Sequence, residues 1–306
     1  SGVAAGIETV VFAFERDGAR ALASLRRGEL DVFPRVLPIH WPDGALTPAV
    51  RAGFREVRLA PQRFTLLVYN QRKAPLGDGR VRRALAMLID RARLVREARR
   101  GLGRLTLPPL FDRALPPHDP AAATRLLDEA GLRDGNADGV RELGAVPLRL
   151  DVLHVSHAPI VEDEIALLRV GLGKGGVAVA GVPVDGAELE ARLRRGAFSA
   201  ALVSYAGRRE TDLGDLLGAR GALNFGGAAS PAIDALLERL RREPPGATRA
   251  RLWGEFGARF AEEAPATFLY APQEVALVRQ TISGFDEGVE WIDLAKLRLT
   301  GAPKAP

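Results

Sequence analysis

Residues Phe64–Val95, FTLLVYNQRKAPLGDGRVRRALAMLIDRARLV, decide the fold of this chain. The apolar and aromatic run Phe64–Tyr69 predicts a buried strand, and the turn after it contains Pro75 and Asp78. From Gly79 onward the apolar residues recur every three or four positions, which predicts one long amphipathic helix. Its arginines are expected mostly on the solvent side (Arg82, Arg83, Arg91, Arg93 and Arg96). A strand followed by a helix that packs against it is typical of an α/β domain.

Length and composition narrow the class of protein. The chain has 306 residues, enough for two domains or one large one, and its 47% hydrophobic and 26% charged content is typical of soluble globular proteins. The net charge is +5, but the arginines are spread along the chain and aromatic residues make up only 6%, so nucleic-acid binding is not expected. The absence of cysteine excludes disulfides, thiolate catalysis and cysteine-ligated metals.

The rest of the chain continues the α/β pattern. Strands and helices alternate from Leu148 to Ser204, with crossovers long enough to make the strands parallel. Ile7–Phe14 is apolar along most of its length and predicts a strand buried on both faces. The other expected elements are helices at Gly18–Arg27, Asp119–Ala130, Ser230–Leu240 and Ala247–Glu263, and strands at Arg55–Leu59 and Thr267–Tyr270.

No catalytic or metal-binding constellation stands out. His154 and His157 are expected to point to opposite faces, and the carboxylates Glu162 and Glu164 are interpreted as solvated. The segment that begins at Asp134 has the first three oxygens of a calcium loop, but its twelfth position is Ala145, so we interpret it as a turn. We therefore expect no enzymatic activity, no metal and no cofactor.

Several segments resemble the family 5 extracellular solute-binding proteins, the dipeptide and oligopeptide receptors of ABC importers. The resemblance rests on the strand, turn and helix of the opening segment and on four further motifs in the family's order. These motifs are Gly28-Glu29-Leu30-Asp31, the Asp119-Pro120 helix start, the Ser230-Pro231 helix start and Arg279–Phe285. Together they cover roughly Val10 to Phe285.

The resemblance implies an α/β fold with two lobes, the type II or Venus-flytrap architecture of periplasmic binding proteins. The first lobe would contain residues 1–65 and 270–306 and would be truncated, because the family's N-terminal portion is missing; the second would contain residues 66–269. A peptide or another small polar or anionic solute would bind between the lobes, without chemical conversion, for delivery to the membrane permease of an ABC importer. The resemblance also implies a periplasmic or extracellular protein, with membrane anchoring through a removed lipoprotein signal.

The resemblance also suggests ligand-binding residues. Tyr205 stands where family members carry an aromatic residue at a strand end, and Arg208 falls near the place of the aspartate that pairs with a peptide's ammonium group. An arginine there favours a carboxylate or phosphate instead. The other candidates are Asp212, Asn224, Phe225, Tyr69, Asn70, Asp31 and Trp41. Asp31 could instead fix its turn, and Trp41 could instead cover the edge of a core.

An alternative remains open at the level of the sequence. A shortened receptor-like domain could serve protein–protein interaction or sensing, or a second chain could supply the missing N-terminal part. A large exposed apolar patch on the first lobe would favour the interaction role.

Overall fold

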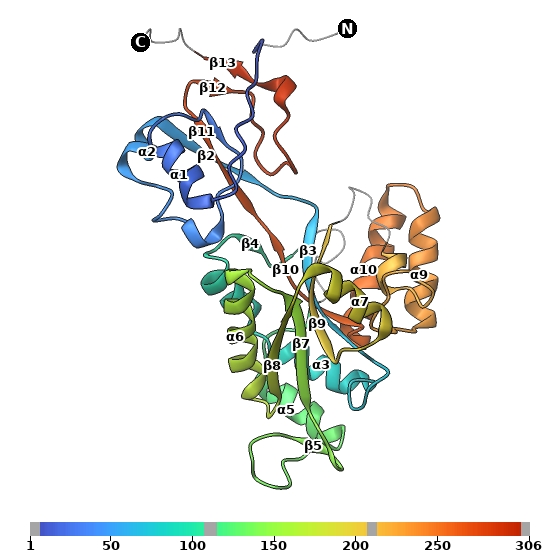
Figure 1. The fold of residues 1–306 in the computed structure, drawn as a ribbon. Helices are drawn as coiled ribbons and strands as arrows, with labels where there is room; N and C mark the ends of the chain where they lie inside the picture. Colours follow the sequence, from blue (N-terminus) through green and yellow to red (C-terminus); the bar gives the residue numbers. More distant parts are fainter. Residues whose placement is uncertain (1–6, 107–114, 207–212, 301–306) are drawn as a thin grey trace. The chain divides into compact units, whose positions relative to one another are not determined.

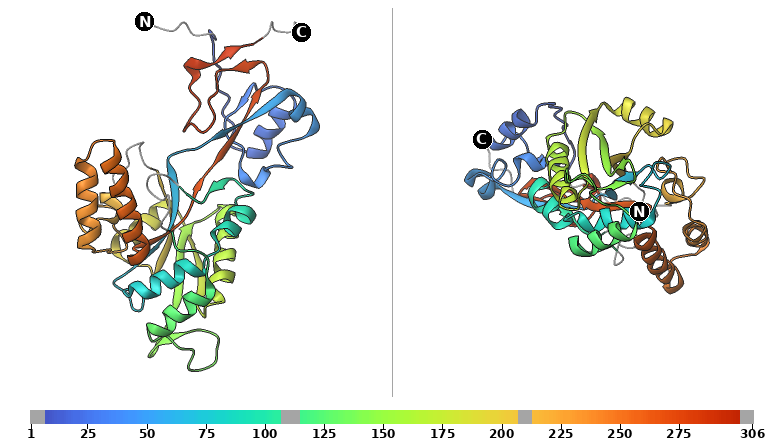
Figure 2. Two further views of the ribbon diagram at one scale, coloured as in Figure 1. Left: turned by 180° about the vertical axis from the view of Figure 1, so that it is seen from behind. Right: turned by 90° about the horizontal axis from the view of Figure 1, so that it is seen from below.

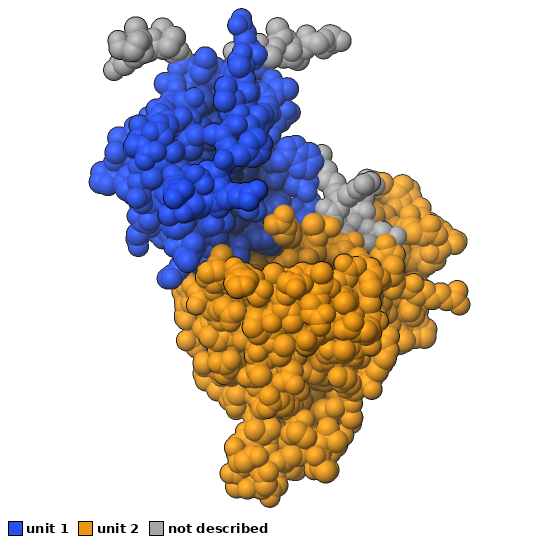
Figure 3. Space-filling model, in the orientation of Figure 1, with its two compact units in different colours: residues 1–62, 99–102, 272–306 blue, residues 63–98, 103–271 orange. Residues whose placement is uncertain are grey.

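The computed structural model describes residues 7–106, 115–206 and 213–300, and its contacts divide the chain into two compact units. Unit 1 consists of residues 1–62, 99–102 and 272–306, and unit 2 consists of residues 63–98 and 103–271 (Figure 3). These limits differ from the predicted lobe boundaries by two or three positions and add the short segment 99–102 to unit 1. None of the described helices is long and apolar enough to cross a membrane.

Unit 2 is built on a six-stranded sheet in the order β4-β10-β3-β9-β7-β8 (Figure 1). Strand β7 pairs in parallel with both β8 and β9, which confirms the parallel arrangement predicted from the alternating pattern. Strand β3 runs antiparallel to β9, and β10 runs antiparallel to β3. The strands are β3 (Arg63–Tyr69), β4 (Gly103–Arg104), β7 (Arg149–Val155), β8 (Ala178–Val184), β9 (Ala200–Ala206) and β10 (Ala266–Pro272).

Helices cover both faces of this sheet (Figure 2). The helices are α3 (Gly79–Leu88), α4 (Arg91–Arg93), η2 (Leu94–Ala98), α5 (Pro120–Glu129), α6 (Pro159–Gly173), α7 (Gly186–Arg195), α8 (Gly214–Leu217), α9 (Pro231–Arg242) and α10 (Ala247–Glu263). A small hairpin, β5 (Glu142–Leu143) and β6 (Val146–Pro147), completes the unit. One core cluster joins Leu67 of the sheet to α3, α5 and α6, and a second joins Phe64 to α7, α9 and α10. Because β3 contributes to both clusters, its residues are almost all buried.

The predicted long helix is wrong in one respect, because it breaks at Asp90. Helix α3 ends at Leu88, and the Asp90 side chain then caps a new helical start by accepting the Arg93 backbone N–H. The apolar spacing continues across this break, so periodicity alone did not reveal it.

Arg82 was expected on the solvent side of α3 but is 6% exposed. Its guanidinium donates hydrogen bonds to four backbone carbonyls, those of Leu76, Gly77, Glu263 and Ala264. Two of them belong to the end of α10, where a cation also stabilises the helix dipole. Burial lowers the pKa of Arg82.

Glu164 also corrects an expectation. This carboxylate is 1% exposed rather than solvated, and it accepts a hydrogen bond of 2.5 Å from the Tyr270 hydroxyl. The sequence places Glu164 on a helix, but it does not show that strand β10, which contains Tyr270, packs against that helix.

Unit 1 is a small sheet in the order β1-β11-β2 with two short helices. Its elements are α1 (Gly18–Arg26), β1 (Val32–Phe33), η1 (Pro38–His40), α2 (Pro48–Gly53), β2 (Phe54–Leu59), β11 (Glu274–Arg279), β12 (Ile282–Ser283), η3 (Leu294–Lys296) and β13 (Arg298–Leu299). Two apolar clusters hold it together. One forms where Leu22 and Val50 of the helices meet Leu277, and the other forms around Val57 and Val278.

The predicted strand Ile7–Phe14 is wrong. The structure shows no strand there, and the side chains of Val11 and Phe14 are 85% and 96% exposed. A strand needs backbone partners, and among the described residues no strand pairs with this segment. Its apolar composition alone was therefore not sufficient to predict its structure.

Candidate functional site

The three parallel strands of unit 2 end at one edge of the sheet. The register pairs Val155 at the end of β7 with Val184 at the end of β8, while β9 runs alongside in the same direction and ends at Ala206. Helices α6 and α7 begin just after β7 and β8, so their N-terminal ends lie at this edge (Figure 1). In open α/β sheets, ligands bind at the carboxyl ends of the strands. Helix N-termini also carry partial positive charge.

Tyr205 lies at this edge and is half-buried. It is paired in register with Phe64, and the two rings are 5.2 Å apart at an interplanar angle of 43°. This contact is a tilted aromatic pair, which fixes the Tyr205 ring on the sheet. A half-exposed ring held in one orientation is suited to stack against a solute.

Two hydroxyl groups accompany it on the opposite face of the same strand pair. The Ser204 Oγ lies 3.1 Å from the Thr65 Oγ1, and Ser204 is exposed whereas Thr65 is 3% exposed. This pair was not predicted from the sequence. A polar Thr65 inside the apolar run Phe64–Tyr69, and a serine directly before Tyr205, were the available signals.

Arg208 and Asp212, which the sequence analysis also placed at this edge, lie outside the described residues. The chain is described again from Leu213, which is buried at 1% exposure and packs in the same core cluster as Phe64.

Tyr69 and Asn70 lie at the other end of the sheet. Tyr69 is paired with Ala200, five residues before Tyr205 along β9, which is a separation of roughly 17 Å. Tyr69 is fully buried and its hydroxyl lies 2.7 Å from the Thr267 Oγ1; burial raises its pKa. The Asn70 side chain donates to the backbone carbonyls of Gly196 and Phe198. Both residues have structural partners, and we leave them out of the site.

Asn224 and Phe225 belong to a loop at this same far end, since Gln71 donates its backbone N–H to the Gly226 carbonyl. The Asn224 amide spans the loop by donating to the Gly218 and Ala228 carbonyls and accepting the Ala228 N–H. The Phe225 ring lies under the Arg194 guanidinium, whose central carbon is 5.8 Å from the ring centroid. The structure therefore does not bring these two residues together with Tyr205.

Asp31 and Trp41 belong to unit 1. Asp31 accepts a 2.6 Å bond from Arg279, which also donates to the Gly28 and Leu30 carbonyls, so this ion pair fixes the turn. Trp41 packs against the apolar cluster around Leu22. For both residues the structural role considered from the sequence is the one that the contacts support.

The loop interpreted as a turn brings the carboxylates of Asp134, Asp138 and Glu142 within 4.8 Å of one another. Their oxygens already accept backbone N–H groups of the loop: Asp134 from Gly139, and Glu142 from Gly135. These bonds close the turn, and we keep the interpretation of this loop as a turn.

Comparison with known proteins identifies the family. A family model described as "Bacterial extracellular solute-binding proteins, family 5 Middle" matches residues 2–219. This chain belongs to the family 5 solute-binding proteins. The resemblance stated from its motifs is thereby confirmed.

Two curated relatives match most of this chain. Protein XP55 of Streptomyces lividans is 29% identical over 266 residues, which are 83% of this chain and 47% of that protein. An uncharacterized lipoprotein of Mycobacterium tuberculosis is 28% identical over 238 residues, 74% of this chain and 39% of its own length. The chain thus spans about half or less of the length of these relatives.

A solved structure shows the same fold. The oligopeptide-binding protein AppA from Bacillus subtilis, in complex with a nonapeptide, matches with a TM-score of 0.75 at 19% identity, over 93% of this chain and 59% of its own. The mixed α/β fold predicted from the sequence is therefore that of the two-lobed solute-binding proteins, in partial length.

Proposed function

We propose that this chain captures a peptide or another small polar or anionic solute for an ABC importer and performs no chemical conversion. The observation that carries the proposal is the sheet edge of unit 2, where parallel strands end beside the half-exposed Tyr205 ring and the exposed Ser204 hydroxyl. Membership of a solute-binding family makes solute capture the function that best accounts for such an edge.

The chemistry at this edge favours polar solutes. The exposed Ser204 hydroxyl can donate or accept a hydrogen bond, and Tyr205, on the other face of the strand pair, offers an apolar ring with a polar tip. Arg208 remains a proposed contact for a carboxylate or phosphate.

The partner and the location follow from the same function. A receptor of this kind would deliver its solute to a membrane permease of an ABC importer, outside the cytoplasmic membrane. The similarity to a mycobacterial lipoprotein supports membrane anchoring of the whole protein. A second chain is not part of the proposal, because none of the comparisons indicates one.

Two single substitutions test where the solute binds. Tyr205→Ala should weaken the binding of a di- or oligopeptide mixture by about tenfold or more in isothermal titration calorimetry, because it removes one stacking surface. Phe225→Ala, at the opposite end of the sheet, should leave the affinity unchanged. Equal losses in both variants, or a loss only in Phe225→Ala, would refute the proposed position.

The second candidate function is protein–protein interaction, and one observation favours it. Unit 1 exposes the apolar side chains of Val11, Phe12 and Phe14, at 85%, 65% and 96%. If this segment docks a protein, Phe12→Asp with Phe14→Asp should change the oligomeric state measured by light scattering and leave peptide binding intact. An unchanged oligomeric state together with measurable peptide binding would favour solute capture alone.

A further inference from the structure

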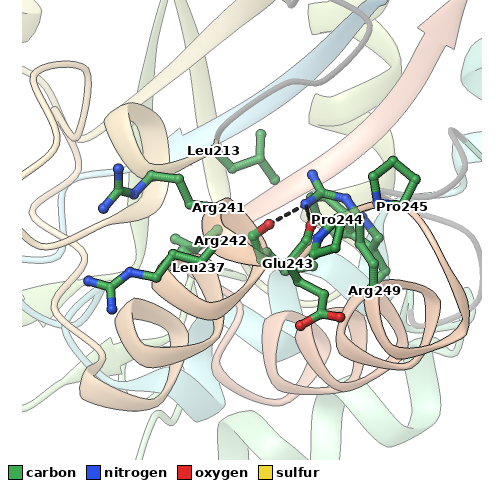
Figure 4. Close-up of a pocket in the computed structure, with 10 residues that line it drawn as sticks. Leu213, Leu237, Arg241, Arg242, Glu243, Pro244, Pro245 and Arg249 are labelled. Carbon is green, nitrogen blue, oxygen red and sulfur yellow. Dashed lines mark hydrogen bonds between the residues drawn. The ribbon is translucent and has the colours of Figure 1, made fainter.

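A cavity of about 300 Å³ lies in unit 2 where α9 ends and α10 begins (Figure 4). Among the described residues, ten line the cavity, and neither Tyr205 nor Ser204 is one of them. The size is at the lower end of the range of small-molecule sites in proteins. It therefore raises the question of a second ligand.

The floor of the cavity is apolar and fixed in place. Leu213, Leu237, Leu240 and Trp253 are each 1–8% exposed, and all four belong to the core cluster of this face of the sheet. Trp253 also packs edge-on against Phe256, with ring centroids 5.6 Å apart. Because these side chains are held by the core, the floor is present before any ligand arrives.

The cavity also contains a guanidinium that no carboxylate of the described residues neutralises. One Arg249 nitrogen donates to the backbone carbonyls of Leu240 and Glu243, while its Nε and other amino nitrogen have no hydrogen-bond partner among the described residues. Within the same part of the chain, no carboxylate lies within ion-pair distance of Arg249. Figure 4 shows the Glu243 carboxylate directed away from it. Two nitrogens, which carry three N–H groups, are thus available to a ligand.

The rim adds further positive charge. Arg241 and Arg242 both form ion pairs with the carboxylate of Glu238. Their side chains are 57% and 73% exposed, and they can reorient at little cost. The apolar floor and the cationic rim together suit an amphiphilic anion. The hydrocarbon part of such a ligand would contact the floor, and its anionic group would contact the guanidinium groups.

We propose that this cavity binds an organic monocarboxylate with a medium-length hydrocarbon chain. The carboxylate accepts hydrogen bonds from the free Arg249 nitrogens and is attracted by Arg241 and Arg242, while the hydrocarbon lies on the leucine floor beside Trp253. A cavity volume of about 300 Å³ is that of a small ligand, which suits a chain of about eight carbons. The proposal does not depend on the function of the Tyr205 edge.

Octanoate is the probe, and octanol and octylamine are its neutral and cationic counterparts. Titration calorimetry on the full chain should give a dissociation constant of about 1 mM or tighter for octanoate and at least about tenfold weaker binding for the other two. Octanoate should also change the fluorescence of the wild type, and this change should be lost in Trp253→Phe while the heat of binding remains.

Charge variants decide whether the guanidinium groups bind the carboxylate. Arg249→Gln, and separately Arg241→Gln with Arg242→Gln, should each weaken octanoate binding by about fivefold to tenfold and leave octanol unaffected. The double variant changes only exposed side chains, so it remains informative if Arg249→Gln unfolds. Arg251→Gln is the matched control on the same helix, since Arg251 is 68% exposed and does not line the cavity.

The result that overturns the proposal is octanoate binding no tighter than octanol or octylamine, or no binding up to about 10 mM. Equal affinity in the double variant and the wild type overturns it as well. Tyr205→Ala should not alter octanoate binding, so failure at this cavity and failure at the solute edge are distinguishable.

Discussion

At the scale of single residues, Arg82 joins parts of unit 2 that are far apart in sequence. Its four hydrogen bonds connect the turn before α3 to the end of α10, and all four acceptors are backbone carbonyls. Arg82→Met would leave these carbonyls without their donor in a buried place. We expect the free energy of unfolding in urea to fall by about 2–4 kcal/mol.

The matched control is Arg83→Met, one position further along α3 and half-buried. It should change the unfolding free energy by no more than about 0.5 kcal/mol. A similar loss in both variants would show that the stability depends on general charge and not on the carbonyl bonds of Arg82.

Asp78 supplies a pH-dependent test at the same scale. Its carboxylate caps α3 by accepting the Arg80 N–H and also binds the Arg80 side chain, whose hydrogen bond lowers the pKa of Asp78 below the usual 3.8. Because the folded-state pKa is the lower one, this stabilisation is complete above pH of about 4 and is lost as pH falls through the folded-state value.

We expect Asp78→Ala to cost about 1 kcal/mol of unfolding free energy at pH 7 and progressively less below about pH 4. Asp78→Asn keeps a capping oxygen and should lose less. A wild-type advantage over the alanine variant that stays constant down to pH of about 2 would contradict the assigned role of the carboxylate.

At the scale of elements, two glycines should respond in opposite ways to the same substitution. Gly254 lies inside α10 with open space where a Cβ would lie, so Gly254→Ala should raise the unfolding free energy by about 0.5–1 kcal/mol. In β8, a Cβ on Gly181 would lie 2.9 Å from Ile165 and 3.0 Å from His154. Gly181→Ala should therefore lower the unfolding free energy by about 1–3 kcal/mol. Denaturant titration of both variants measures the two changes in unfolding free energy. Changes in the same direction would contradict the packing described for these two glycines.

Regular elements could be predicted from the sequence where local signals and packing agree. The Asp119 and Ser230 side chains accept backbone N–H groups at the starts of α5 and α9, as their positions before proline predicted. The predictions were wrong where contacts with residues far away in the sequence determine the structure. Ile7–Phe14 has no partner strand among the described residues. Two of the carbonyls that accept hydrogen bonds from Arg82 belong to residues about 180 positions away in the sequence.

The candidate site shows the same limit. Tyr205 lies near the end of β9, where the sequence predicted a strand to end, but sequence order could not show that the antiparallel pairing of β3 places Tyr69 at the opposite end. The Ser204–Thr65 contact joins residues that are 139 positions apart, and only the register of two strands reveals it.

At the scale of the whole molecule, the central claim is that the chain holds one solute and releases it unchanged. The exposed apolar segment near Phe12 and the cavity beside Arg249 are separate features, and neither is required for this claim. The claim therefore depends on solute binding itself.

Native mass spectrometry of the purified chain, incubated with a mixture of di- to nonapeptides, tests it most directly. The account predicts a mass excess equal to one peptide per chain, absent or much reduced in Tyr205→Ala, with the peptide recovered at its original mass after unfolding. A bare mass in the wild type, an excess that Tyr205→Ala does not reduce, or a recovered peptide of altered mass would contradict it.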